Sequence, residues 1–308
     1  MELPVLGVPT TFVTNFPAVL GIVEETFGHW AAFTLPADQP GSVAPTIRIA
    51  VNGGHPASTP IAGFRYRLPD RHRLLVTCDG GVAVADTLRY EAVAYVDESL
   101  VTRHLEFAEG MLEPLTLFVL GALDREPLHA AGIVRDGVAI LLAGRSGTGK
   151  STLTYAAWRH GFSLLADEPV YVQMRPRLRL WGRRPRVHLR PDALVHFPEL
   201  RGLPVSTLPS GKSKIVVPIG SRVEPCVERA ALCLLSPGRR DRSPTLERIT
   251  VDEAVAELGR ELEPGFDLFA GTIEDRICAI AALGAWRLRV ARSPTDALPL
   301  LERIAAEL

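Results

Sequence analysis

Runs of consecutive apolar residues, separated by short polar breaks, mark the second half of the chain. The run Val138 to Ala143 has no polar position, which is typical of a strand buried on both faces. A second run, Phe162 to Ala166, predicts a short buried strand parallel to the first. Residues Ser151 to His160 between them predict a helix that Gly161 ends. This order predicts an α/β fold in which both strands open into one ligand-binding edge.

The strand Val138 to Ala143 is approached by another strand. Residues His129 to Arg135 form a strand-like run, and Asp136-Gly137 separates the two runs. An Asp-Gly pair between strands is a strong signal for a two-residue hairpin. The sequence therefore predicts an antiparallel hairpin that leads into the ligand edge.

The first hundred residues have shorter, alternating patterns that predict a mainly β region with one helix, Pro17 to Phe27. Leu105 to Leu123 predicts a buried amphipathic helix that docks on the second half. We expect an N-terminal α+β domain, 1–124, that serves recognition or assembly, and a second domain, 125–308. Further predicted elements are the strands 46–51, 64–68, 73–78 and 82–86, a turn at Asp79-Gly80-Gly81, a helix opened by a Thr250 to Glu253 capping box that runs to about Leu262, and a C-terminal helix from Ser293-Pro294 to Leu308.

Composition narrows the class of protein. The 308 residues are 47% hydrophobic and 22% charged, the profile of a folded globular chain of about two domains. The net charge of −1 gives no global reason to expect a nucleic acid or an anionic membrane as partner. The longest apolar stretch, Leu115 to Leu123, is too short for a membrane span, and no basic residue precedes Arg48 to form the start of a signal peptide. We therefore expect no membrane contact and a cytoplasmic location.

A glycine-rich loop follows the strand Val138 to Ala143. Gly144 to Ser151 reads GRSGTGKS, which satisfies the P-loop pattern G-x-x-x-x-G-K-[ST] between a strand and a helix. In such a loop, backbone N–H groups surround phosphates, the lysine reaches the β- and γ-oxygens, and the serine ligates Mg²⁺. The predicted nucleotide-binding residues are Gly144, Arg145, Ser146, Gly147, Thr148, Gly149, Lys150, Ser151 and Thr152, and the expected cofactors are ATP and Mg²⁺.

Two adjacent carboxylates, Asp167 and Glu168, follow the strand Phe162 to Ala166. Their place at its carboxyl end predicts that they face the same edge as the glycine-rich loop. One could hold Mg²⁺ while the other accepts a proton from an attacking hydroxyl or water.

Together these motifs resemble the catalytic domain of HPr serine kinase/phosphorylase and its broader relatives, with phosphoenolpyruvate carboxykinases sharing the architecture more distantly. The segments are Leu128 to Gly132, the loop Gly144 to Ser151, and Arg159 to Glu168. The resemblance implies a P-loop kinase core, covers roughly residues 125 to 300, and is specific between 128 and 168. It assigns the active-site histidine to His129, the phosphate lysine to Lys150, the metal-binding serine to Ser151, and an acidic pair to Asp167 and Glu168, with Glu168 as proton acceptor.

The chain departs from that family in two respects. The family has two aspartates where this chain has Asp167-Glu168, and the segment that docks HPr has no recognisable counterpart. These departures weaken the expectation that HPr is the substrate or that a reverse, phosphorolytic activity exists, and the pattern is closer to the HPr kinase-like proteins of unassigned substrate.

Basic residues after the acidic pair form a candidate lid over a transferred phosphoryl group: Arg186, His188, Arg190, Lys212 and Lys214. Only three of the 34 basic residues are lysines, and all three lie in the loop or this lid. The alternative is a solvated, arginine-rich hairpin.

The sequence predicts a kinase that transfers the γ-phosphoryl group of ATP to a hydroxyl acceptor, either a protein or peptide serine or a small alcohol. His129, Lys150, Asp167 and Glu168 are the expected catalytic residues, and Ser151 and Asp167 the expected metal ligands. The alternative is a nucleotide-gated regulatory or binding protein without phosphotransfer. A homo-oligomer is expected from the resemblance alone.

Overall fold

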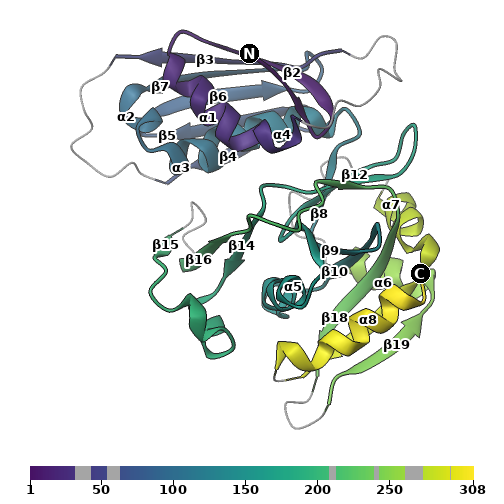
Figure 1. Ribbon diagram of the computed structural model, residues 1–308. Coiled ribbons are helices and arrows are strands. Elements are labelled where there is room, and N and C mark those ends of the chain that lie inside the picture. Colours follow the sequence, from purple (N-terminus) through teal and green to yellow (C-terminus); the bar gives the residue numbers. More distant parts are fainter. Residues whose placement is uncertain (32–42, 54–62, 208–212, 239–242, 261–272, 292) are drawn as a thin grey trace. The chain divides into compact units, whose positions relative to one another are not determined.

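A computed structural model describes residues 1–31, 43–53, 63–207, 213–238, 243–260, 273–291 and 293–308. The chain separates into two compact units, the first Met1–Arg125 and the second Glu126–Thr207 with Ser213–Leu308 (Figure 1). This division lies one residue after the boundary expected from the sequence. Among the described residues, no helix is long and apolar enough to cross a membrane.

The first unit is a seven-stranded mixed sheet in the order β1-β2-β3-β7-β6-β5-β4. Its strands alternate, apart from β4, which is exposed throughout: in β3, Ile47, Ile49 and Val51 are buried, while Arg48 and Ala50 are exposed. Such alternation places one face against a core and leaves the other exposed within the unit. The strands are β1 Glu2–Val5, β2 Val8–Thr14, β3 Thr46–Asn52, β4 Arg65–Asp70, β5 Arg73–Cys78, β6 Gly81–Asp86 and β7 Glu91–Asp97.

The helices of this unit correct one expectation. The segment predicted as a helix over Leu105 to Leu123 is α3 His104–Phe107, a π-helical turn Ala108–Leu112, and α4 Glu113–Gly121. Helix α4 packs on β5, β6 and β7 of its own unit. The buried, apolar character expected of the segment is confirmed, but one continuous helix is not, because a π-helical turn interrupts it. The other helices are α1 Pro17–Phe27, as predicted, and α2 Glu98–Val101.

The second unit is built on a six-stranded sheet in the order β11-β9-β10-β18-β20-β19. The predicted hairpin is confirmed: β9 and β10 pair with Arg135 opposite Val138, and Asp136 and Gly137 both have positive φ. Strand β11 runs in the same direction as β10, as predicted, but β9 lies between them. The six strands are β9 Ala130–Arg135, β10 Val138–Ala143, β11 Ser163–Ala166, β18 Ala230–Pro237, β19 Thr245–Ile249 and β20 Ala285–Val290.

Helices cover both faces of this sheet. Ile140 and Leu142 of β10 lie in a core with α5 and α8, whereas Ala139 and Leu141 lie in a second core with α6 and α7. Burial on both faces explains why β10 is continuously apolar. The helices are α5 Lys150–Arg159, α6 Val251–Arg260, α7 Ile273–Ile280 and α8 Leu298–Ala306.

The predicted helix ends are largely confirmed. Thr250 and Glu253 exchange the hydrogen bonds of a capping box at the start of α6. The predicted end of that helix near Leu262 falls outside the described residues. At the C-terminus, the first turn after Ser293 is a 3₁₀-helix, Pro294–Ala297, and α8 follows it.

Two smaller sheets complete the unit. One has the order β17-β13-β12-β8 and the other the order β14-β16-β15. Val187, Leu189, Ile215 and Val217 of the three-stranded sheet join the core that contains α5. These strands are β8 Glu126–Leu128, β12 Val170–Gln173, β13 Arg179–Trp181, β14 Arg186–Leu189, β15 Val205–Thr207, β16 Ser213–Pro218 and β17 Cys226–Val227.

Candidate active site

The glycine-rich loop connects the buried strand β10 to helix α5. Gly144 and Gly149 have φ values of 143° and 97°, which side chains rarely tolerate. A Cβ at Gly144 would also lie 2.6 Å from the Leu235 carbonyl oxygen. Inside the loop, Thr148 donates from its backbone N and its Oγ1 to the Arg145 carbonyl oxygen, at 3.1 and 2.9 Å. The loop is therefore a closed turn that ends at the N-terminus of α5.

Lys150, the first residue of α5, joins the loop to two other parts of the chain. Its side chain is 5% exposed, and Nζ donates to the Gly144 carbonyl oxygen at 2.7 Å. The same Nζ lies 3.1 Å from Nε2 of His129 and 3.5 Å from Oε1 of Glu168. His129 lies between β8 and β9, and Glu168 follows β11. Three predicted catalytic residues are thus brought together at one edge of the sheet.

Glu168 is the centre of this group, since its Oε1 also contacts Nε2 of His129. Burial alone raises the pKa of Glu168, but the hydrogen bond from His129 and the positive charge of Lys150 outweigh burial and leave the pKa below its ordinary value. The carboxylate is therefore ionised at neutral pH and able to accept a proton.

Asp167 has a different environment from its neighbour. It is 4% exposed, and its Oδ2 accepts a hydrogen bond from the backbone N of His188 at 2.7 Å, with His188 Nδ1 at 3.6 Å. Its other oxygen, Oδ1, is buried without a hydrogen-bond partner among the described residues. A buried carboxylate oxygen in that state fits a cation ligand. Of the described residues, however, no three His, Cys, Asp or Glu side chains cluster into a metal site by themselves.

The lid residues are brought to this edge only in part. Lys214 donates from Nζ to the His188 carbonyl oxygen at 3.2 Å, which ties β16 to β14 beside Asp167. Arg190 lies over the loop, because a Cβ at Gly147 would come within 3.7 Å of its Nη2. Arg186 begins β14 opposite Pro218, two residues from His188. Lys212 lies outside the described residues.

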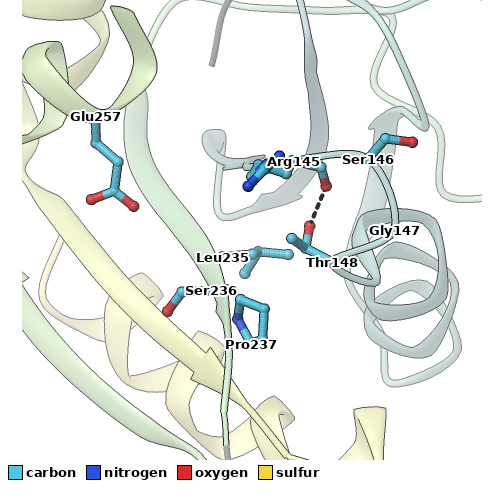
Figure 2. Close-up of a pocket in the computed structure, with 8 residues that line it drawn as sticks. All are labelled: Arg145, Ser146, Gly147, Thr148, Leu235, Ser236, Pro237 and Glu257. Carbon is cyan, nitrogen blue, oxygen red and sulfur yellow. Dashed lines mark hydrogen bonds between the residues drawn. The ribbon is translucent and has the colours of Figure 1, made fainter. Parts of the chain in front are cut away.

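A cavity of about 370 Å³ adjoins the other side of the loop (Figure 2). Four of its residues belong to the predicted loop, but Leu235, Ser236 and Pro237 at the end of β18, and Glu257 of α6, were not expected from the sequence. The only sequence signal near these residues is that a polar residue and a proline, Ser236 and Pro237, end a buried apolar strand. Such a signal does not identify a ligand site.

Known proteins resemble part of the chain. HPr kinase/phosphorylases from Lactobacillus delbrueckii subsp. bulgaricus and Limosilactobacillus reuteri are each 35% identical, over 80 and 102 residues, or 26% and 32% of this chain. These matches span only 23% and 30% of the relatives' lengths. No family model matches the chain. A solved HPr(Ser) kinase/phosphatase from Coxiella burnetii aligns with a TM-score of 0.32 at 14% identity, over 60% of this chain and 100% of that one.

The sequence matches support the resemblance, and the structural alignment is too weak to add to it. Over these 80 to 102 residues the chain is similar to the HPr kinase/phosphorylases, and the resemblance indicated by its motifs is confirmed.

Proposed function

We propose that this protein is an ATP-dependent phosphotransferase with a P-loop core, which moves the γ-phosphoryl group of ATP to a hydroxyl acceptor. The observation that carries the proposal is the meeting of Lys150, His129 and Glu168 beside the glycine-rich loop. A loop and a lysine suffice to bind phosphates, but an ionised carboxylate beside them is what a hydroxyl needs to lose its proton.

In this proposal the loop and Lys150 bind the phosphates. Backbone N–H groups of Gly144 to Gly149 and the N-terminus of α5 supply positive potential. Lys150 exchanges its bond to the Gly144 carbonyl oxygen for phosphate oxygens, and Arg190 above Gly147 adds a second positive charge. His129 adds hydrogen-bonding capacity where charge develops on the transferred group.

Mg²⁺ would be held by Asp167 and Ser151. The buried, unpartnered Oδ1 of Asp167 suits a cation, and Ser151 follows Lys150 at the start of α5. When bound, the ion supplies charge neutralisation on the phosphate oxygens. The role of the protein is then to keep the Asp167 carboxylate fixed through the His188 backbone N–H.

Glu168 acts as the general base. The acceptor oxygen forms a bond to the γ-phosphorus, the bond from that phosphorus to the β,γ-bridging oxygen breaks, and ADP leaves with the electron pair. The acceptor hydroxyl proton passes to Glu168. Before the acceptor binds, His129 and Lys150 keep this carboxylate ionised.

The acceptor is a serine of a protein or peptide, or a small alcohol. The relatives act on HPr by name, but the aligned segment is too short a part of them to transfer that substrate to this chain. The first unit, Met1–Arg125, is proposed to recognise the acceptor or to mediate assembly.

The alternative function is nucleotide-gated binding without transfer. Such a protein needs the loop and Lys150 but has no use for a carboxylate held ionised beside them, and the Glu168 environment therefore favours transfer.

Incubation of γ-labelled ATP with cell extract, with and without the purified chain, tests the proposal. We expect a new labelled acceptor that is lost with Lys150→Arg, because a guanidinium fork cannot replace a compact ammonium in this enclosed position. A variant with more than about a tenth of wild-type transfer would contradict this role, because a decade corresponds to only about 1.4 kcal/mol.

A further inference from the structure

The cavity beside the glycine-rich loop lies on the opposite side of the loop from Lys150, His129 and Glu168, the proposed catalytic residues. In the sheet order, β9 and β11 lie on one side of β10, and β18 lies on the other. Glu168 follows β11, whereas Ser236 and Pro237 end β18 and line the cavity. A nucleotide with its γ-phosphate at Glu168 and its other phosphates on the loop therefore extends toward this cavity.

The chemistry of the cavity suits a neutral polar group better than a further phosphate. Glu257 contributes a carboxylate, which repels phosphate and accepts hydrogen bonds from neutral donors. Its Oε2 accepts from Nη2 of Arg287 at 2.8 Å, which fixes the side chain and leaves Oε1 to accept from a ligand. Ser236 adds an Oγ that is buried without a hydrogen-bond partner among the described residues. Arg145 also lines the cavity, so the lining carries a guanidinium as well as the Glu257 carboxylate. The cavity is thus suited to an uncharged polar group whose hydrogen-bond donors face Glu257.

The position of Glu257 across the cavity from the loop determines which part of the nucleotide it meets. Figure 2 shows Glu257 on the wall across from Ser146 and Gly147, with Arg145 between them. The ribose follows directly on the α-phosphate and so lies near the loop, whereas the base reaches the far wall. Hydrogen-bond donors of the base, rather than ribose hydroxyls, therefore face Glu257.

We propose that this cavity binds the purine base of the nucleotide, and that Glu257 selects adenine by accepting a hydrogen bond from its exocyclic amino group. The inference rests on the proposed function, since the phosphates set the direction of the nucleotide. Hypoxanthine, the base of ITP, has a carbonyl oxygen where adenine has the amino group, and that oxygen would face the carboxylate.

Calorimetric titration with ATP, ITP and inorganic tripolyphosphate, each with Mg²⁺, tests the assignment. Wild-type protein should bind ATP at least about tenfold more tightly than ITP, which corresponds to about 1.4 kcal/mol. In Glu257→Gln this preference should fall below about threefold, because the amide can turn its NH₂ toward the ITP oxygen and still accept from Arg287. Tripolyphosphate, which has no base, should bind both proteins equally.

Asp252→Asn is the matched control, because Asp252 is an exposed carboxylate on the same helix outside the cavity. It should keep the wild-type preference. Equal binding of ATP and ITP by wild-type protein, or an unchanged preference in Glu257→Gln, would overturn the base assignment. The proposed function would not be affected by either result. If wild-type protein bound neither nucleotide, or if Lys150→Ala left tripolyphosphate binding unchanged, the proposed function would fail with it.

Discussion

Asp167 and Glu168 are adjacent in sequence but differ in their contacts, and the proposal gives them different roles. Glu168→Gln keeps size and hydrogen bonding but cannot accept a proton. It should bind Mg·ATP almost normally and lose about 10² to 10⁴ in turnover, the usual range for a general base. Asp167→Asn should instead weaken Mg·ATP binding. Calorimetry beside a turnover assay separates the two effects.

Glu199→Gln is the control for this pair, because Glu199 is an exposed carboxylate whose partner is Arg159, outside the cluster of Lys150, His129 and Glu168. It should change neither quantity. Equal loss of nucleotide affinity in Glu168→Gln and Asp167→Asn would refute the division of roles.

The environment of Glu168 also predicts a dependence of stability on pH. Its folded-state pKa is lowered from an ordinary value of 4.5, although burial opposes the shift, because His129 and Lys150 favour the charged form. The carboxylate therefore contributes stability that is present above the unfolded-state pKa and is lost as pH falls through the folded-state pKa. Below pH 4.5, the unfolding free energies of wild type and Glu168→Gln should converge. A difference that grows on acidification in this range would mean that the assigned direction is wrong.

At the scale of elements, the acidic pair depends on the close approach of the strand before it to a glycine. A Cβ at Gly182, directly after β13, would lie 1.9 Å from the carbonyl oxygen of Leu165 in β11. Gly182→Ala must therefore separate the two segments, and we expect a loss of about 1–3 kcal/mol of unfolding free energy, as for other overpacked sites. Transfer activity should fall as well, because β11 leads directly into Asp167.

Gly220→Ala provides the comparison, because a Cβ at Gly220 meets nothing within 4 Å. It should be nearly neutral in denaturant unfolding. Equal midpoints for the two variants would show that β11 and the segment after β13 can separate without cost.

Local elements of both units were predictable from the sequence, and the segments they pack against were not. The Asp136-Gly137 turn and the end of α5 at Gly161 depend on residues adjacent in the chain, so their patterns specified them. The insertion of β9 between β10 and β11, and the packing of α4 on its own unit, depend on long-range pairing. An apolar face records that a segment is buried but not what buries it.

At the scale of the whole molecule, the candidate site combines predictable and unpredictable parts for the same reason. The loop, Asp167 and Glu168 follow strands and carry compact motifs, whereas Glu257 reaches the cavity from a helix more than a hundred residues beyond the loop. Only the folded sheet places it beside Arg145.

Nucleotide binding should be visible as stabilisation of the protein. A ligand that binds only the folded state stabilises it by about 2.7 kcal/mol at a concentration 100 times its Kd. ATP with Mg²⁺ should therefore raise the thermal midpoint, and ATP with a chelator should raise it much less. An equal increase in both conditions would remove Asp167 and Ser151 from the metal assignment.

The most direct test of the central claim is to compare ATP labelled at the γ-phosphate with ATP labelled at the α-phosphate in the same extract assay. Transfer of the γ-phosphoryl group predicts a labelled acceptor from γ-labelled ATP alone, stable to removal of free nucleotide and strongly reduced with Glu168→Gln. Label from the α-phosphate would show nucleotidyl transfer instead. Binding of Mg·ATP with no labelled acceptor from either nucleotide, across extracts and candidate hydroxyl compounds, would contradict the account and leave a nucleotide-binding protein without phosphotransfer.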